Sequence, residues 1–142
     1  MANDPVYGKP FISQLGPYLF SGQFLGLLFS RVLQGGLSVQ DGVIAHPGGL
    51  QPAAVQITAS IFNVVTCATA GNSIALPKAI KGSIVKGDNN GAQSMNVFAK
   101  VGSGDTINGT AGTTAFAHAN AKRIEYTCLT AGKWLTSTAS IP

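Results

Sequence analysis

The chain has 142 residues, of which 45% are hydrophobic and only 10% are charged. A typical soluble domain has about 25% charged residues, and disordered chains combine few apolar residues with many charges. The composition therefore excludes a disordered chain and predicts one domain plus an extension. The net charge of +4 arises after residue 54 from scattered basic residues without an arginine-rich run, so we expect no nucleic-acid partner.

Proline distribution divides the chain near residue 54. Five of the seven prolines precede this point, and central β-strands exclude proline because it removes a ladder hydrogen bond. We therefore expect residues 1–54 to form an extended N-terminal arm and residues 55–142 to form a β domain. The five arm prolines are Pro5, Pro10, Pro17, Pro47 and Pro52.

The most apolar part of the arm is residues 17–33, where helical spacing predicts a short helix that starts at Pro17. Gly22 and Gly26 weaken this helix by about 1 kcal/mol each relative to alanine. The run is close to the lower limit for a membrane span and is interrupted by polar residues, so we expect docking against protein, with lipid association as the alternative. The expected docking contacts are Tyr18, Leu19, Phe20, Phe24, Leu27, Leu28 and Phe29.

The first half of the β domain shows strand patterns separated by turn residues. Residues 55–61 alternate with period two and lead into the β-branched run 62–66, and residues 73–76 form a further short strand. Residues 80–85 and 94–101 are expected to pair as a hairpin across the turn at residues 87–91, which has the sequence GDNNG.

The second half has a tight turn at residues 106–109 and alternating polarity from residue 122 to residue 130. Ile124, Tyr126 and Cys128 are expected to face the core, and residues 131–132 turn into a strand in which Trp134 anchors it. Short strands without intervening helical patterns predict a mainly β fold. We expect a small antiparallel sandwich or barrel that is jelly-roll-like.

Catalytic chemistry is not indicated by the residues available. His46 and His118 lie in different regions and are expected to be surface or loop residues. The carboxylates of the β domain, Asp88, Asp105 and Glu125, show no spacing typical of a paired acid and base. No sequence motif of a hydrolase, metalloprotease or nucleotide-binding loop occurs. We therefore expect no enzyme activity, no catalytic residue, no metal and no cofactor.

Two cysteines, Cys67 and Cys128, lack the spacing of a metal site. We expect both to be reduced and buried in strands, with a single disulfide as the alternative if the two strands are neighbours. The first ten residues do not resemble a secretory signal, so synthesis in the cytoplasm of the producing cell is expected.

Four short motifs follow one another between residues 75 and 136: an LP pair at Pro77, NVF ending at Phe98, GDTING, and C-x-x-x-GKW. In this order they resemble small β domains of tailed-phage virion proteins, which occur in head decoration (cement) proteins and in head or tail fibres. The resemblance implies a virion setting and a motif of turn and core residues. These are Pro77, Phe98, Asp105, Asn108, Gly109, Tyr126, Cys128 and Trp134.

The resemblance and the apolar arm together predict a capsid decoration protein on the surface of the virion. Its expected partners are the major capsid protein or other virion proteins, and it is expected to form a homotrimer. A fibre, spike or tail-associated protein that takes part in host attachment is the first alternative. A lipid-associated protein that uses residues 17–33 is the second.

Overall fold

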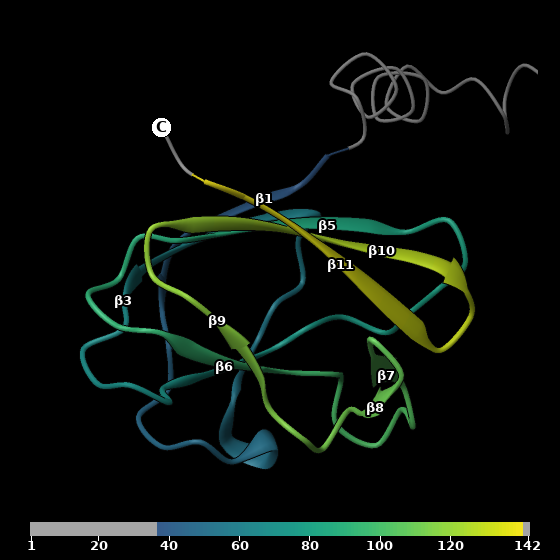
Figure 1. The fold of residues 1–142 in the computed structure, drawn as a ribbon, viewed down its shortest axis with the longest axis horizontal. Coiled ribbons are helices and arrows are strands. Elements are labelled where there is room, and N and C mark those ends of the chain that lie inside the picture. Colours follow the sequence, from purple (N-terminus) through teal and green to yellow (C-terminus); the bar gives the residue numbers. More distant parts are fainter. Residues whose placement is uncertain (1–36, 141–142) are drawn as a thin grey trace, which may run out of the picture. The chain divides into compact units, whose positions relative to one another are not determined.

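The computed structural model describes residues 37–140, and the chain divides into two units, Met1–Leu37 and Ser38–Pro142 (Figure 1). Every described strand belongs to the second unit, which we call the β unit. The predicted helix near residues 17–33 lies outside the described residues. The same holds for the expected docking contacts Tyr18, Leu19, Phe20, Phe24, Leu27, Leu28 and Phe29.

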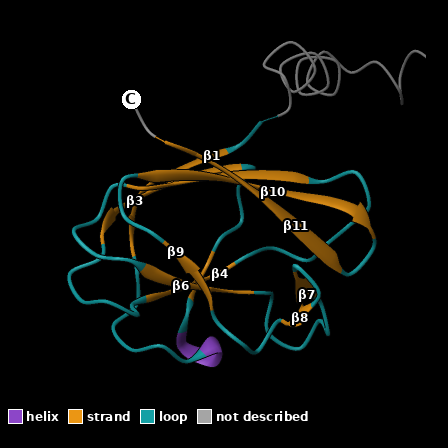
Figure 2. Ribbon diagram, viewed as in Figure 1, coloured by secondary structure: helices purple, strands orange, loops and turns teal. Residues whose placement is uncertain are grey.

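The β unit consists of two mixed sheets and almost no helix (Figure 2). The order of the seven-stranded sheet is β1 (Val39–Ile44), β3 (Ile61–Thr66), β5 (Ile84–Asn89), β10 (Lys122–Thr130), β11 (Lys133–Ser140), β7 (Thr106–Ile107) and β8 (Thr110–Ala111). The order of the four-stranded sheet is β2 (Val55–Gln56), β4 (Ser73–Ala75), β6 (Met95–Phe98) and β9 (Phe116–His118). A short 3-10 helix, η1 (Gln51–Ala53), precedes β2.

The first six strands alternate between the two sheets in a solenoid-like path. The strands β1, β3 and β5 are parallel neighbours in one sheet, and β2, β4 and β6 are parallel neighbours in the other. Each connection crosses to the opposite sheet, so the next strand of the same sheet runs in the same direction. The mainly β prediction is confirmed, but the prediction of antiparallel pairing is wrong for these strands.

Antiparallel pairing occurs mainly in the last part of the chain. The strand β9 pairs with β6, and β10 pairs with both β5 and β11. The predicted strand 122–130 coincides with β10, because its alternation places Ile124, Tyr126 and Cys128 inside the protein. The predicted turn after it is also confirmed, since Gly132 has a φ of 78° between β10 and β11.

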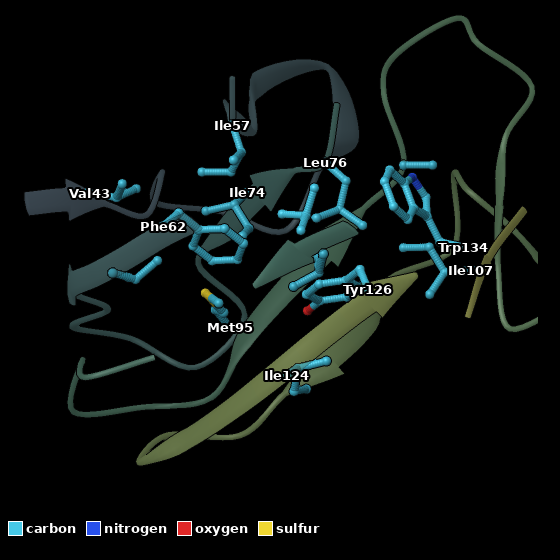
Figure 3. Close-up of a cluster of buried hydrophobic side chains, with 14 of the residues drawn as sticks. Val43, Ile57, Phe62, Ile74, Leu76, Met95, Ile107, Ile124, Tyr126 and Trp134 are labelled. Carbon is cyan, nitrogen blue, oxygen red and sulfur yellow. The ribbon is translucent and has the colours of Figure 1, made fainter. Parts of the chain in front are cut away.

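One hydrophobic core receives side chains from both sheets (Figure 3). Trp134, Tyr126 and Phe62 are among its largest fully buried side chains. The rings of Phe62 and Tyr126 stack with their centroids 6.5 Å apart, and the burial of each such side chain contributes about 1.5–3 kcal/mol. The expected role of Trp134 in the core is therefore confirmed.

The predicted hairpin around residues 87–91 is wrong, because Gly87 lies within β5 and not in a turn. A Cβ atom on Gly87 would lie 2.0 Å from Cζ of Phe62. Because glycine has no side chain, the buried ring of Phe62 can pack directly against β5 at this position. Asn89 is also buried, and its side-chain amide donates to the carbonyl oxygens of Gln93 and His118. Since β5 and β6 belong to different sheets, they do not pair.

The predicted continuous strand 55–66 is divided into β2 and β3. At residues 57–60 the chain passes from one sheet to the other, and Ile57 and Ala59 remain buried there. The apolar alternation of residues 55–61 runs across this crossing, so the sequence pattern does not mark the break. Burial nevertheless shifts by one residue after Ala59, since Ser60 and Ile61 are both half-buried and Phe62 is buried. The strand expected at 73–76 is present as β4.

The β unit begins before residue 55, contrary to the expected boundary. The strand β1 pairs with β3 through Val39↔Ile61 and Gln40↔Phe62, so residues 38–54 belong to the β unit and not to an arm. Pro47 and Pro52 lie between β1 and β2, outside both strands. Proline marked a connection here, not the end of an extended segment.

Candidate functional site

The motif residues predicted from the sequence lie mostly in the interior of the β unit. Phe98, Tyr126, Cys128 and Trp134 are buried, and Pro77 is half-buried just after β4. The four buried side chains hold the core together and are not available to a binding partner.

Asp105 joins three separate segments near the β10–β11 turn. Its carboxylate Oδ2 accepts a hydrogen bond from the Ala79 amide at 2.8 Å, and its carbonyl oxygen accepts one from the Gly112 amide at 3.0 Å. Its own amide donates to Oγ of Ser103 at 3.2 Å. Asp105 is buried, so its side-chain oxygen satisfies an interior amide that would otherwise be unpaired.

Asn108 and Gly109 form the turn between β7 and β8, and both have positive φ, 50° and 79°. Two successive positive φ values are typical of a type I′ turn, which Asn-Gly favours. The Asn108 side chain also donates to Oγ1 of Thr136 at 2.8 Å and accepts from the Thr136 amide at 3.0 Å. The predicted tight turn is confirmed, and its side chain attaches the hairpin to β11.

His118 is buried in the four-stranded sheet and is not the surface or loop histidine that we expected. Its Nε2 lies 2.9 Å from the Lys122 carbonyl oxygen, which can only accept, so Nε2 carries the hydrogen. Nδ1 therefore accepts from the hydroxyl of Tyr126 at 3.1 Å. The sequence pattern that could have indicated a buried His118 is the alternation in β9, where Phe116 and His118 lie on the same side of the strand. His46, in contrast, is exposed.

Burial determines the protonation of this pair. It lowers the pKa of His118, although the Lys122 carbonyl and the charge of Asp88 act in the opposite direction. Burial also raises the pKa of Tyr126. The histidine is therefore neutral and the tyrosine is protonated near pH 7, in agreement with the hydrogen-bond directions.

The described carboxylates are all engaged. Asp88 receives two hydrogen bonds from Arg123 at 2.6 and 2.7 Å, and Glu125 lies 3.2 Å from Nζ of Lys86. Asp41 accepts from the side chain of Asn63. Within residues 37–140, no group of three or more histidine, cysteine or acidic side chains is placed to hold a metal ion.

The cysteines are buried and neither is in a disulfide. Cys67 follows β3, and Cys128 lies in β10. Burial raises the pKa of the Cys67 thiol, which disfavours the reactive thiolate.

The outer face of the seven-stranded sheet is the candidate interaction surface, since its side chains alternate with those of the core. One half carries the ion pairs Lys86–Glu125 and Asp88–Arg123. The other half carries aliphatic side chains, whose exposure was not predicted from the sequence. They are Ile84 and, on the neighbouring strands, Leu129 and Leu135, which are all exposed.

No family model matches this chain, and no curated protein matches it significantly. Within residues 37–140, no helix has both the length and the apolar character of a membrane span.

Proposed function

We propose that this protein is a capsid decoration (cement) protein that binds the assembled head shell of a tailed phage. The single structural observation that supports the proposal is the exposed aliphatic half of the outer sheet face, where Ile84, Leu129 and Leu135 lie together. Exposed aliphatic side chains gathered on one part of a surface, here with Thr127 between Ile84 and Leu135, are typical of protein interaction sites. The order of the motifs around Pro77, Phe98, Asp105 and Trp134 supports the virion setting through its resemblance to phage β domains.

The proposed action is stabilisation by preferential binding. A protein that binds the assembled lattice, but not its separate subunits, shifts the equilibrium toward the lattice. In this proposal the β unit is a rigid, sandwich-like body, because both sheets share one core. The apolar residues 17–33 add a second contact, and the protein acts on the capsid surface as a homotrimer.

The scarcity of charge fits such a role. Charged residues amount to 10% of the chain, and surfaces that lie against other protein are depleted in charge. On the outer sheet face, Lys86 pairs with Glu125 and Asp88 pairs with Arg123. The exposed aliphatic side chains lie beside these two ion pairs.

The proposal is tested by comparing particles that carry the protein with particles from which its gene is deleted. Both are heated in steps, and genome release is followed with a dye that does not enter intact heads. We expect particles without the protein to rupture at a lower temperature, and re-addition of the purified protein to restore the higher temperature. Equal rupture temperatures would contradict the cement role.

A further inference from the structure

A turn of the chain lies against the β10–β11 hairpin and extends the aliphatic surface. The amide of Gly82 donates to the Cys128 carbonyl oxygen at 2.7 Å, and the amide of Gly132 donates to the Ala79 carbonyl oxygen at 2.9 Å. The turn at residues 80–83 is therefore held beside residues 128–132. It places Ile80, which is 61% exposed, next to the strand that carries Leu129, which is 63% exposed.

Cross-strand pairing connects this turn to the rest of the surface. Thr127 of β10 is opposite Ile84 of β5 on one side and opposite Leu135 of β11 on the other, so the three side chains share one row. We define the aliphatic patch as Ile80, Ile84, Leu129 and Leu135.

A shallow groove of about 220 Å³ borders the patch. Its walls combine apolar residues with polar ones: Ala59, Pro77, Ile80, Ile84 and Val85 on the one hand, and Thr58, Ser60, Lys78 and Ser83 on the other. The apolar part of this recess can receive an apolar side chain from a partner, which a flat surface cannot do.

Three lysines belong to the same segments as the patch residues, and we call them the basic rim: Lys78, Lys81 and Lys133. All three are exposed, and within residues 37–140 none of them forms an ion pair. Lys78 and Lys81 flank Ile80 in sequence, whereas Lys133 lies on the same face of β11 as Leu135 because side chains alternate along a strand.

We infer that the aliphatic patch and its basic rim bind an acidic segment of a different protein that also carries aliphatic side chains. The inference deepens the proposed docking function, on which it rests for its biological setting. Apolar side chains of the segment occupy the patch and the groove, and its carboxylates pair with the lysines.

Charge complementarity argues against a second copy of this chain as the occupant. Each described carboxylate already has a partner or is buried: Asp41 with Asn63, Asp88 with Arg123, Glu125 with Lys86, and Asp105 in the interior. Residues 1–36 contain one acidic residue, Asp4, against Lys9 and Arg31. Asp41, whose side-chain partner is the uncharged amide of Asn63, is the only exposed carboxylate of residues 37–140 without a basic partner. One such carboxylate cannot complement three lysines, and the sequence of the chain contains no acidic segment.

An anionic membrane fits the patch less well than a protein segment. Tryptophan and tyrosine are enriched at membrane–water interfaces, whereas this patch contains no aromatic side chain. The groove beside it is also recessed, which suits an inserted side chain better than a lipid surface.

The inference is tested with the full chain and a synthetic peptide in which leucine and glutamate alternate. Amide chemical shifts of the isotope-labelled protein are followed by NMR as the peptide is added. Two comparison peptides replace leucine by serine or glutamate by lysine. We expect shifts centred on residues 78–84 and 127–135 with the first peptide and much weaker binding of the other two. No binding, or binding centred elsewhere, would overturn the inference.

Removal of the rim charges provides the second part of the test. The triple variant Lys78→Gln, Lys81→Gln and Lys133→Gln is expected to bind the peptide about tenfold more weakly, since each exposed ion pair contributes only modestly. Lys100→Gln is the matched control, because Lys100 is an exposed lysine that follows β6 and lies outside the patch. Equal affinity of the triple variant and the wild type would contradict the role of the rim.

Loss of the aliphatic contact is tested separately. Leu129→Ser is expected to weaken binding severalfold, whereas Leu50→Ser, which alters another exposed leucine beside η1, leaves it unchanged. Tighter binding to anionic vesicles than to the peptide would favour lipid, and self-association through the patch in sedimentation would favour a second copy; either result overturns the inference. Peptide binding without any effect on particle rupture would instead contradict the cement role alone.

Discussion

Replacement of Gly87 by alanine tests the parallel packing of β5 on β3. The added Cβ would lie 2.0 Å from Cζ of Phe62 and 2.5 Å from each of its Cε atoms, whereas carbon atoms pack best at about 3.5–4.0 Å. Phe62 is fully buried and stacks on Tyr126, so the ring has no space into which it can move. Overpacking of this kind costs about 1–3 kcal/mol and occasionally more. We expect a loss of about 3 kcal/mol, a large part of the roughly 5–15 kcal/mol that stabilises a domain.

The free energy of unfolding is measured by urea denaturation, with the fluorescence of the buried Trp134 as the signal. The control is Gly102→Ala, because a Cβ there meets nothing within 4 Å although φ is 70°; this variant loses about 1–2 kcal/mol of backbone origin. The substitution Phe62→Leu should reduce the loss of stability that Gly87→Ala causes, but not the loss that Gly102→Ala causes. A loss below about 1 kcal/mol for Gly87→Ala, or no relief by Phe62→Leu, would refute the packing described for β3 and β5.

Three further predictions concern the buried and turn residues. Burial lowers the pKa of His118 in the folded state, so the unfolded chain binds the proton of this histidine more tightly. The free energy of unfolding should therefore fall as the pH drops below about 6.5. For one proton, the fall is at most about 1.4 kcal/mol per pH unit. Urea denaturation between about pH 7 and pH 5 measures this slope, and His118→Gln should reduce it; an unchanged slope would show that another group is responsible. Asn108→Ala should lower the free energy of unfolding by about 2 kcal/mol, since it removes both hydrogen bonds to Thr136 and strains a positive φ. Asn108→Gly should lower it less in the same denaturation experiment, because glycine tolerates the positive φ. Equal losses of stability in the two variants would contradict the contribution of the turn conformation. The thiol of Cys67 should react with a thiol reagent only after urea unfolds the protein, because burial raises its pKa, and rapid reaction of the native protein would contradict this burial.

The strands that could be predicted from the sequence are those whose pairing is local. The alternation of residues 122–130 gives β10, and Gly132 gives the turn that follows it. The Asn108–Gly109 turn was predictable for the same reason, since the preference for positive φ resides in the two residues themselves. In each case the residues of the segment itself were sufficient to predict its structure.

The parallel sheets could not be predicted in this way. Parallel pairs such as β1–β3 and β3–β5 join segments separated by an excursion to the other sheet, and alternation within one segment does not reveal its distant partner. Gly87 illustrates the second difficulty. Glycine is favoured both in turns and where another side chain approaches the backbone, and only the position of Phe62 shows which reason applies.

The aliphatic patch was not predicted either. Ile80, Ile84, Leu129 and Leu135 come from three separate segments of the sequence, and each taken alone reads as a core residue. An exposed face arises only from the register that sets Thr127 between Ile84 and Leu135. Docking surfaces on sheet faces therefore require the pairing of strands to be known.

The central claim, that this chain is a structural component of a phage head shell, is tested most directly by its copy number in purified particles. Quantitative mass spectrometry of intact virions gives the ratio of this protein to the major shell protein. A cement protein is expected in a fixed ratio that matches the symmetry positions of the shell, with the protein lost neither on removal of tails nor on washing. A few copies per particle that separate with the tails, or no copies at all, would contradict the claim.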